Sequence, residues 1–222
     1  MRLLKVSLLV ICALALATSS FAQSKPLVST ADQAASAGLP IFGANASLAE
    51  WGHAWVSSIA VPFTVSQTGW KVDKIGIVAF GPSQMDAGST AQSVIVRIYG
   101  DDPNADRPNT SDIIAESQVD NITSIKKYLV SLNVELAAGK YWLALLPAFD
   151  DTRVSWVKSA SAVGQFSNVT TERITTPDGK TSFVIAQAQS CPADALMASV
   201  PVFEIGGTVN RASSSKDRMQ QR

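Results

Sequence analysis

Residues 128–146 read YLVSLNVELAAGKYWLALL, and this stretch already indicates a β fold. Its first half alternates apolar and polar residues, the pattern of a strand with one buried face. Residues 137–140 (AAGK) then turn the chain, and residues 141–146 (YWLALL) are almost continuously apolar. A run of this kind suits a central strand that is buried on both faces. We therefore expect a hairpin here, with its second strand in the middle of a sheet.

Further strand patterns lie on both sides of this stretch. Residues 93–99 (SVIVRIY) alternate, with Arg97 and Tyr99 on the wetter face. The apolar residues change parity near Asp73-Lys74, which predicts a β-bulge, and Asp178-Gly179 is a strong hairpin signal. About ten such strands, with little helix, predict an all-β fold, an antiparallel jelly-roll-like β-sandwich.

Three features at the N-terminus predict a signal peptide over residues 1–22. Arg2 and Lys5 form a basic start, Leu8–Ala17 is apolar, and Ser20-Phe21-Ala22 places small residues at −3 and −1 of a cleavage site. The apolar run is too short to span a bilayer, and no later stretch reaches the roughly 18 residues that a span needs. We expect a secreted or extracellular protein, with the periplasm as an alternative.

The remaining chain divides into three parts by composition. Residues 23–50 are rich in Ala, Ser and Gly and are expected to form a linker or an N-terminal arm, with a short helix over Thr30–Ala37 capped by Thr30. Residues 51–209 carry the strand patterns and are expected to be the β-sandwich domain. Residues 210–222 are polar and are expected to be a disordered tail.

Composition excludes several functional classes. The chain has 18 basic and 18 acidic side chains, and removal of Arg2 and Lys5 with the signal peptide leaves 16 basic ones. Nucleic acid is therefore not an expected partner, because phosphate binding requires a basic surface. Cleavage also leaves Cys191 as the one cysteine, which we expect to be buried and inert. His53 is the one histidine, so the chain has too few ligands for a zinc site and a single candidate base for a cysteine or serine hydrolase.

The middle of the chain resembles a known domain. Residues 93–101 (SVIVRIYGD), 128–132 (YLVSL), 136–143 (LAAGKYWL) and 202–207 (VFEIGG) occur in this order. The region 56–207 is thereby similar to a domain of secreted bacterial proteins of the sorting-tail (PEP-CTERM-like) type. The resemblance implies a jelly-roll-like sandwich related in shape to carbohydrate-binding modules, and no catalytic residues. Because the Pro-Glu-Pro sorting motif is missing, it does not imply anchoring.

One loop has the composition of a calcium site. Asp102, Asn104 and Asp106 place side-chain oxygens at alternate positions, a spacing that can direct three oxygens at one hard cation. The alternative is a solvated hairpin loop made of turn-forming residues. Calcium is the one cofactor that the sequence suggests.

Two of the five tryptophans are candidate ligand contacts. Trp51 and Trp55 precede the first strand, and exposed there they could stack on sugar rings. The alternative is that they pack the N-terminal arm onto the domain. Trp142 and Trp156 lie within apolar strands and are expected in the core.

These observations favour a secreted, non-enzymatic β-sandwich that binds a carbohydrate or another cell-surface component. Two alternatives stay open: a structural envelope or matrix protein without a small ligand, and a glycan hydrolase whose carboxylate pair the sequence does not reveal. Four Asn-x-Ser/Thr sequons are attributed to chance in a bacterial chain: those of Asn45, Asn109, Asn121 and Asn168.

Overall fold

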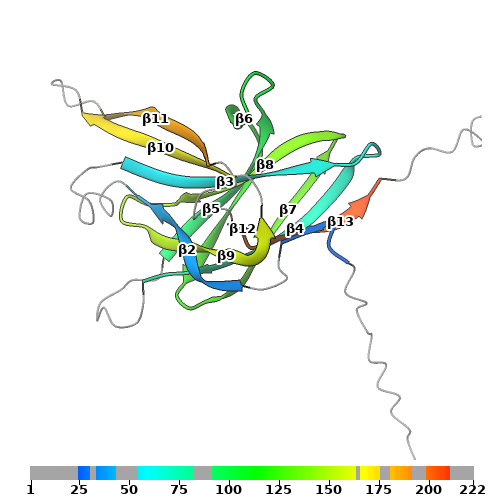
Figure 1. Ribbon diagram of the computed structural model, residues 1–222, viewed down its shortest axis with the longest axis horizontal. Coiled ribbons are helices and arrows are strands. Elements are labelled where there is room, and N and C mark those ends of the chain that lie inside the picture. Colours follow the sequence, from blue (N-terminus) through cyan, green and yellow to red (C-terminus); the bar gives the residue numbers. More distant parts are fainter. Residues whose placement is uncertain are drawn as a thin grey trace, which may run out of the picture.

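The computed structural model describes residues 25–30, 34–43, 55–82, 92–163, 166–175, 181–191 and 199–210. Figure 1 shows the strands in these ranges and labels most of them. Their bounds are Val28–Ser29 (β1), Ala34–Phe42 (β2), Trp55–Val65 (β3), Trp70–Phe80 (β4), Gln92–Asp101 (β5), Pro108–Ile122 (β6), Lys126–Leu136 (β7), Gly139–Pro147 (β8), Arg153–Val163 (β9), Phe166–Thr175 (β10), Thr181–Cys191 (β11), Ser199–Pro201 (β12) and Phe203–Val209 (β13).

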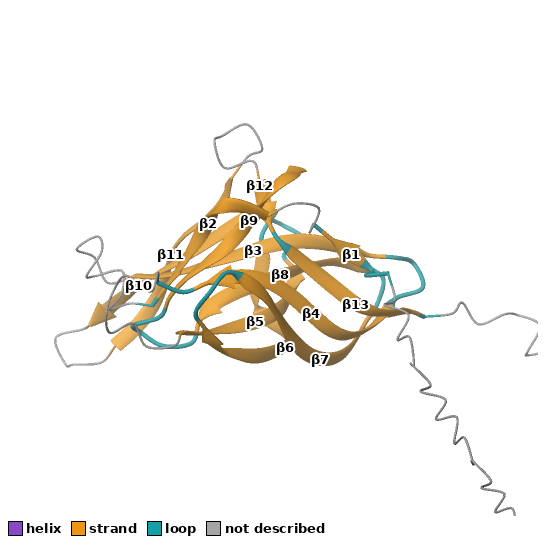
Figure 2. Cartoon of the chain, turned by 90° about the horizontal axis from the view of Figure 1, so that it is seen from below, coloured by secondary structure: helices purple, strands orange, loops and turns teal. Residues whose placement is uncertain are grey.

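The strands form an antiparallel sheet that folds around one core. Its main path runs β1-β13-β4-β9-β2-β3-β8-β5-β6, while β7 pairs with β4, β12 with β9, and the β10–β11 pair with β3. Figure 2 shows the backbone of the folded sheet. Side chains of β3, β5 and β8 share one apolar cluster with those of β4, β7 and β13. The all-β antiparallel class is confirmed and is consistent with a sandwich, whereas the pairings do not establish a jelly-roll order. Within the described ranges, no helix is long and apolar enough to cross a membrane.

The strand β8 lies in the interior of the sheet, with a neighbour on each side, as its apolar run predicts. It pairs with β3 on one side and β5 on the other. One face of β8 sends Leu143 and Leu145 into the main core, and the opposite face buries Trp142 and Ala144 in a second, smaller apolar cluster. Trp142 and Trp156 are both fully buried, so their expected place in the core is confirmed.

Two local predictions are also confirmed. The pairing of β4 with β7 shifts register between Val72 and Lys74, which is the bulge expected at Asp73-Lys74. The strands β10 and β11, which flank the Asp178-Gly179 signal, pair with each other in antiparallel register. The turn itself lies outside the described residues.

The hairpin expected around residues 137–140 is wrong. The strands β7 and β8 follow each other in the chain, but β7 pairs with β4, while β8 pairs with β3 and β5. Both strands turn apolar faces toward the shared core, Val130 and Leu136 from β7 and Leu143 and Leu145 from β8. The connection therefore runs from the part of the sheet that contains β4 to the part that contains β3, β8 and β5. Burial of the two apolar faces decides the pairing more than the short turn does.

The helix expected over Thr30–Ala37 is also wrong. Residues 34–37 begin β2, which pairs with β9. The Oγ1 of Thr30 does not cap a helix; it donates to the carbonyl of Pro201 at 2.7 Å and accepts from the N–H of Phe203 at 2.9 Å. The segment forms a strand because it has no amphipathic helical face, and because pairing with the adjacent sheet provides hydrogen-bond partners for its backbone N–H and C=O groups. Two strands thus lie within the segment 23–50.

The two ends of the described chain meet in one pair of strands. Val28 of β1 lies opposite Ile205 of β13, and the N–H of Leu27 donates to the carbonyl of Ile205 at 2.8 Å. On its other side β13 pairs with β4. The strand β1 therefore covers the edge of the sheet that β13 would otherwise form.

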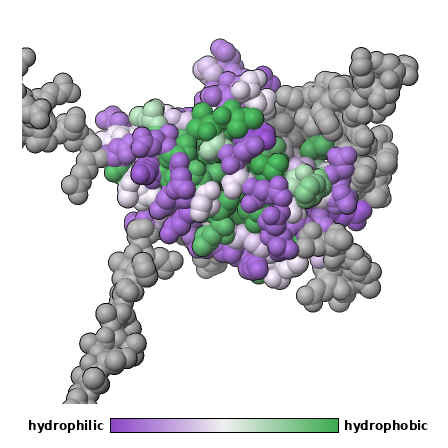
Figure 3. All heavy atoms as spheres, turned by 180° about the vertical axis from the view of Figure 1, so that it is seen from behind, coloured by the Kyte–Doolittle hydropathy of each residue, from purple (hydrophilic) through white to green (hydrophobic). Residues whose placement is uncertain are grey.

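Not all large apolar side chains are buried. Figure 3 shows one face of the molecule, on which apolar and polar side chains lie next to one another. Among the described residues, the exposed large apolar side chains are Ile113, Ile125, Leu129, Phe149 and Val209. Phe149 is the one that borders the hollow described next.

Candidate functional site

A groove lies on the face of β3, β5 and β8 that is turned away from the main core. Its floor consists of small residues, because Ala60 of β3 lies opposite Ala144 of β8, and Ala144 lies opposite Arg97 of β5. Two register positions further, on the same face of the sheet, Trp142 and Tyr99 are paired and are much larger. The groove forms because small side chains lie next to large ones on the same face of the sheet.

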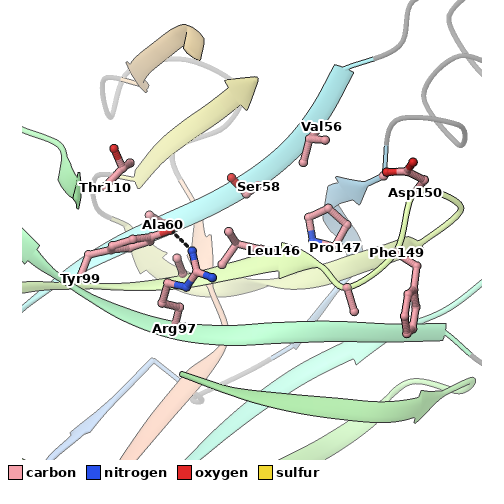
Figure 4. Close-up of a pocket in the computed structure, with 13 residues that line it drawn as sticks. Val56, Ser58, Ala60, Arg97, Tyr99, Thr110, Leu146, Pro147, Phe149 and Asp150 are labelled. Atoms are coloured by element: carbon pink, nitrogen blue, oxygen red, sulfur yellow. Dashed lines mark hydrogen bonds between the residues drawn. The ribbon is translucent and has the colours of Figure 1, made fainter. Parts of the chain in front are cut away.

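The groove has the size of a ligand site. Its volume is about 460 Å³, within the range of roughly 300 to 1,000 Å³ that small-molecule pockets occupy. In Figure 4 it extends from Tyr99 and Thr110 at one end to Phe149 and Asp150 at the other. Apolar side chains supply much of the lining, while hydroxyl, carboxylate and guanidinium groups supply its polar part; the lining includes Val56, Ser58, Ala60, Arg97, Ala144 and Leu146.

The rim at Phe149 is held by buried hydrogen bonds. The hydroxyl of Thr152, which is 2% exposed, accepts from the N–H of Phe149 at 3.0 Å and donates to the carbonyl of Ser93 at 3.2 Å. Gly43 packs so closely that an added Cβ would lie 2.1 Å from the carbonyl oxygen of Phe149. These contacts fix the backbone of the rim, while the Phe149 ring itself is 59% exposed.

Arg97 is held at the groove by a network of polar contacts. Its Nε and Nη2 donate to one oxygen of Glu116 at 2.8 and 2.6 Å, and its Nη1 donates to the hydroxyl of Tyr99 at 2.7 Å. Burial disfavours the charged guanidinium, but the hydrogen bonds and charges of Tyr99 and Glu116 outweigh it and raise the pKa of Arg97. Arg97 is therefore a fixed, permanently charged donor.

The structure does not describe the side chains of the two tryptophans expected to stack on a sugar. Trp51 lies outside the described residues, and Trp55 is the first residue of β3, at a position whose side chain is not described. The next residue of that strand, Val56, lines the groove. The roles of Trp51 and Trp55 stay predictions.

The expected calcium loop brings its three residues to one hollow, together with a lysine. Asp102, Asn104 and Asp106 line it with Lys140, whose Nζ contacts Asp106 and lies 3.4 Å from Asp101. Within the described part of the chain, no group of three acidic, histidine or cysteine side chains is arranged to hold a metal. Calcium would have to displace the ammonium group of Lys140, so binding of calcium stays a prediction that the geometry does not favour.

The carboxylate of Asp102 is already engaged within its loop. One oxygen accepts the N–H of Asn104 at 3.0 Å, and the other accepts Nε of Arg107 at 3.2 Å. The bond from Asn104, followed by that from Arg107, lowers the pKa of Asp102. Bonds from Gln118 and Ser93 likewise lower the pKa of Asp120.

These contacts predict how stability depends on pH. A carboxyl whose pKa is lowered on folding stabilises the protein above its ordinary value of 3.8, so stability should decline as pH falls through and below that value. Burial opposes the charge on Lys140, but Asp106 and Asp101 outweigh it and raise its pKa, so its contribution to stability should be lost as pH rises above 10.5.

Thermal unfolding measured across pH tests both the decline in acid and the decline in alkali. The variant carrying Asp102→Asn and Asp120→Asn should decline less steeply in acid; an unchanged acid limb would contradict the assignment.

Comparison with known proteins assigns no family. No protein-family model matches the sequence, and no curated protein is significantly similar to it.

The residues of the groove were not recognised as a site from the sequence. Arg97 and Tyr99 were expected on a wetter strand face, but nothing in the linear sequence places them beside β3 and the rim. The signal that could have found the groove is the small residues Ser58, Ala60 and Ala144 at outward positions of strands that otherwise carry large side chains.

Proposed function

We propose that this protein is a secreted, non-enzymatic β-sandwich that binds a carbohydrate in the groove formed by β3, β5 and β8. The observation that carries the proposal is the lining of this groove. The groove combines apolar surface from Ala60, Ala144 and Leu146 with polar groups, including the Arg97 guanidinium, and the exposed residue Phe149 lies at its rim.

This lining matches the chemistry of a sugar. A pyranose ring presents C–H groups on its faces and hydroxyl groups around its edge. Aromatic and aliphatic side chains bury the faces, while a few fixed polar groups hydrogen-bond the hydroxyls. Phe149 and Leu146 supply apolar contact, and Arg97 supplies donors whose position Glu116 and Tyr99 fix.

The compartment also supports the proposal. The expected signal peptide over residues 1–22 would deliver the protein to the place where extracellular polysaccharides occur. The resemblance of residues 56–207 to a domain of secreted bacterial proteins points to the same compartment and to a shape shared with carbohydrate-binding modules. Fold resemblance alone does not assign a ligand, so the proposal depends on the groove.

Binding is favoured over hydrolysis by the acidic groups of the groove. Hydrolysis of a glycosidic bond uses two carboxyl groups, about 5 to 9.5 Å apart, on either side of the scissile bond. Among the described residues that line the groove, Asp150 is the one carboxylate.

The direct test is to fill the floor of the groove. In Ala144→Leu the added carbons project into the hollow between Ala60 and Arg97, and we expect the affinity for a bound polysaccharide to fall by about tenfold or more. The measurement is pull-down and tryptophan fluorescence of the 23–222 protein with a panel of soluble and insoluble polysaccharides. Ala138→Leu makes the same change at an exposed position outside the groove and should bind normally.

Each result of this panel distinguishes among the functions. Saturable binding that Ala144→Leu weakens supports the groove, and a further loss in Trp51→Ala or Trp55→Ala would add those residues to the site. Release of reducing ends, lost in Asp150→Asn, would indicate a hydrolase. No binding to any polysaccharide would overturn the proposal in favour of a structural protein. Binding that Ala144→Leu leaves intact would place the site elsewhere.

A further inference from the structure

We propose that the groove selects neutral saccharides over acidic ones, because its arginine is already neutralised by a carboxylate of the protein. This inference rests on the proposed carbohydrate-binding function and assigns the class of ligand. It follows from the contacts of Arg97, the charges around the groove and the order of the strands.

The pair of Arg97 and Glu116 is built into the sheet. The two residues lie directly opposite each other on β5 and β6, and both Nε and Nη2 of Arg97 bond the same oxygen of Glu116. The Arg97 side chain is only 18% exposed, whereas that of Glu116 is 52% exposed. A third bond to Tyr99, whose ring centroid lies 5.4 Å from the guanidinium carbon, prevents Arg97 from turning away from this partner.

This network leaves hydrogen-bonding capacity without net charge. A guanidinium has five N–H groups. The bonds to Glu116 and Tyr99 use three of them. Figure 4 shows the guanidinium between Tyr99 and Leu146, at the groove. The two remaining N–H groups can donate to hydroxyl or ring oxygens, while the adjacent carboxylate offsets the attraction that a free arginine would have for an anion.

The other charges around the groove act in the same direction. Asp150 lines the end away from Arg97. Among the described residues that line the groove, Arg97 is the one cationic side chain, and Glu116 is paired with it. A ligand carboxylate or sulfate would therefore enter a partly buried site without an uncompensated positive charge to offset its loss of water. A neutral polyol meets no such penalty.

The test compares each polysaccharide with its own acidic form. A panel of neutral polysaccharides is used both untreated and after oxidation of the C6 primary alcohols to carboxylates, so that each pair differs only in the group at C6, a neutral hydroxymethyl in one and a charged carboxylate in the other. We expect the wild-type protein to bind the untreated form of its ligand at least about tenfold more tightly than the oxidised form.

The variant Glu116→Gln isolates the cause. Its amide oxygen still accepts from Arg97, so the guanidinium keeps its place while the compensating charge is removed. Affinity for the oxidised form should rise by about tenfold, more at low salt than at high salt, and affinity for the untreated form should change by less than about twofold. Glu135→Gln removes an exposed carboxylate of β7, outside the groove, and should change neither affinity.

Three results would count against the inference. Tighter binding of oxidised forms by the wild-type protein would overturn it, as would an unchanged ratio of affinities in Glu116→Gln. In both cases carbohydrate binding in the groove would stand. Absence of binding to untreated and oxidised forms alike would instead overturn the proposed function itself.

Discussion

Replacement of Trp156 by alanine should destabilise the protein by about 3 to 5 kcal/mol, the range for removal of a large buried aromatic side chain. Trp156 is fully buried in β9, and its register partners are Leu39 of β2 and Ala79 of β4. Its Nε1 donates to the carbonyl of Val202 at 2.9 Å, a bond that joins β9 to the residue just before β13. The change therefore opens a cavity where three parts of the sheet meet. Equilibrium unfolding in urea measures the loss.

Trp156→Phe separates packing from hydrogen bonding. It keeps an aromatic ring but removes the N–H that Val202 accepts, and the carbonyl of Val202 also accepts the N–H of Val78 at 3.2 Å. Because that second donor remains, the loss should be about 1 to 2 kcal/mol. A loss below about 1 kcal/mol in Trp156→Ala would show that the site is not part of a continuous core.

The second large effect is expected for Gly207→Ala. Gly207 has a φ of 154°, and a Cβ there would lie 2.1 Å from the carbonyl oxygen of Lys71 on β4. The pairing of β13 with β4 shifts register at this point, opposite the bulge at Asp73. Since backbone atoms rather than a mobile side chain cause the clash, β13 must move away from β4. We expect a loss of about 2 to 4 kcal/mol in the free energy of unfolding.

Gly139→Ala is the matched control. Gly139 begins β8, and the nearest atom to a Cβ there is Cε2 of Tyr141 at 3.6 Å, an ordinary contact. The stability change should stay within about 0.5 kcal/mol. If the two alanine variants unfolded at the same urea concentration, the close approach of β13 to β4 at Gly207 would be wrong.

Alternation and turn chemistry were enough to predict the class of fold from the sequence. The interior position of β8 in the sheet follows from its continuous apolar run, and the bulge at Asp73-Lys74 follows from a change of parity within one strand. These features are local, because the side chains of one strand report whether one or both of its faces are buried.

Partners distant in sequence could not be predicted in this way. The short segment at residues 137–140 favours a hairpin locally, yet the strands that it connects pair with different neighbours, β7 with β4 and β8 with β3. The groove depends on the same kind of information, since Ala60, Ala144 and Arg97 become neighbours only when the order β3-β8-β5 is known. Periodicity gives the face of a residue, whereas its neighbours across the sheet depend on the whole topology.

The pairing of β1 with β13 has a consequence for the order in which the protein folds. Thr30 and Pro201, which a hydrogen bond joins, are 171 positions apart, so this edge of the sheet cannot form until nearly the whole chain has been synthesised. Contacts over such separations carry a large loop-closure entropy and slow folding. The nascent chain therefore stays without its closing strands during synthesis, and closure of the edge between β1 and β13 follows release of the C-terminal strand.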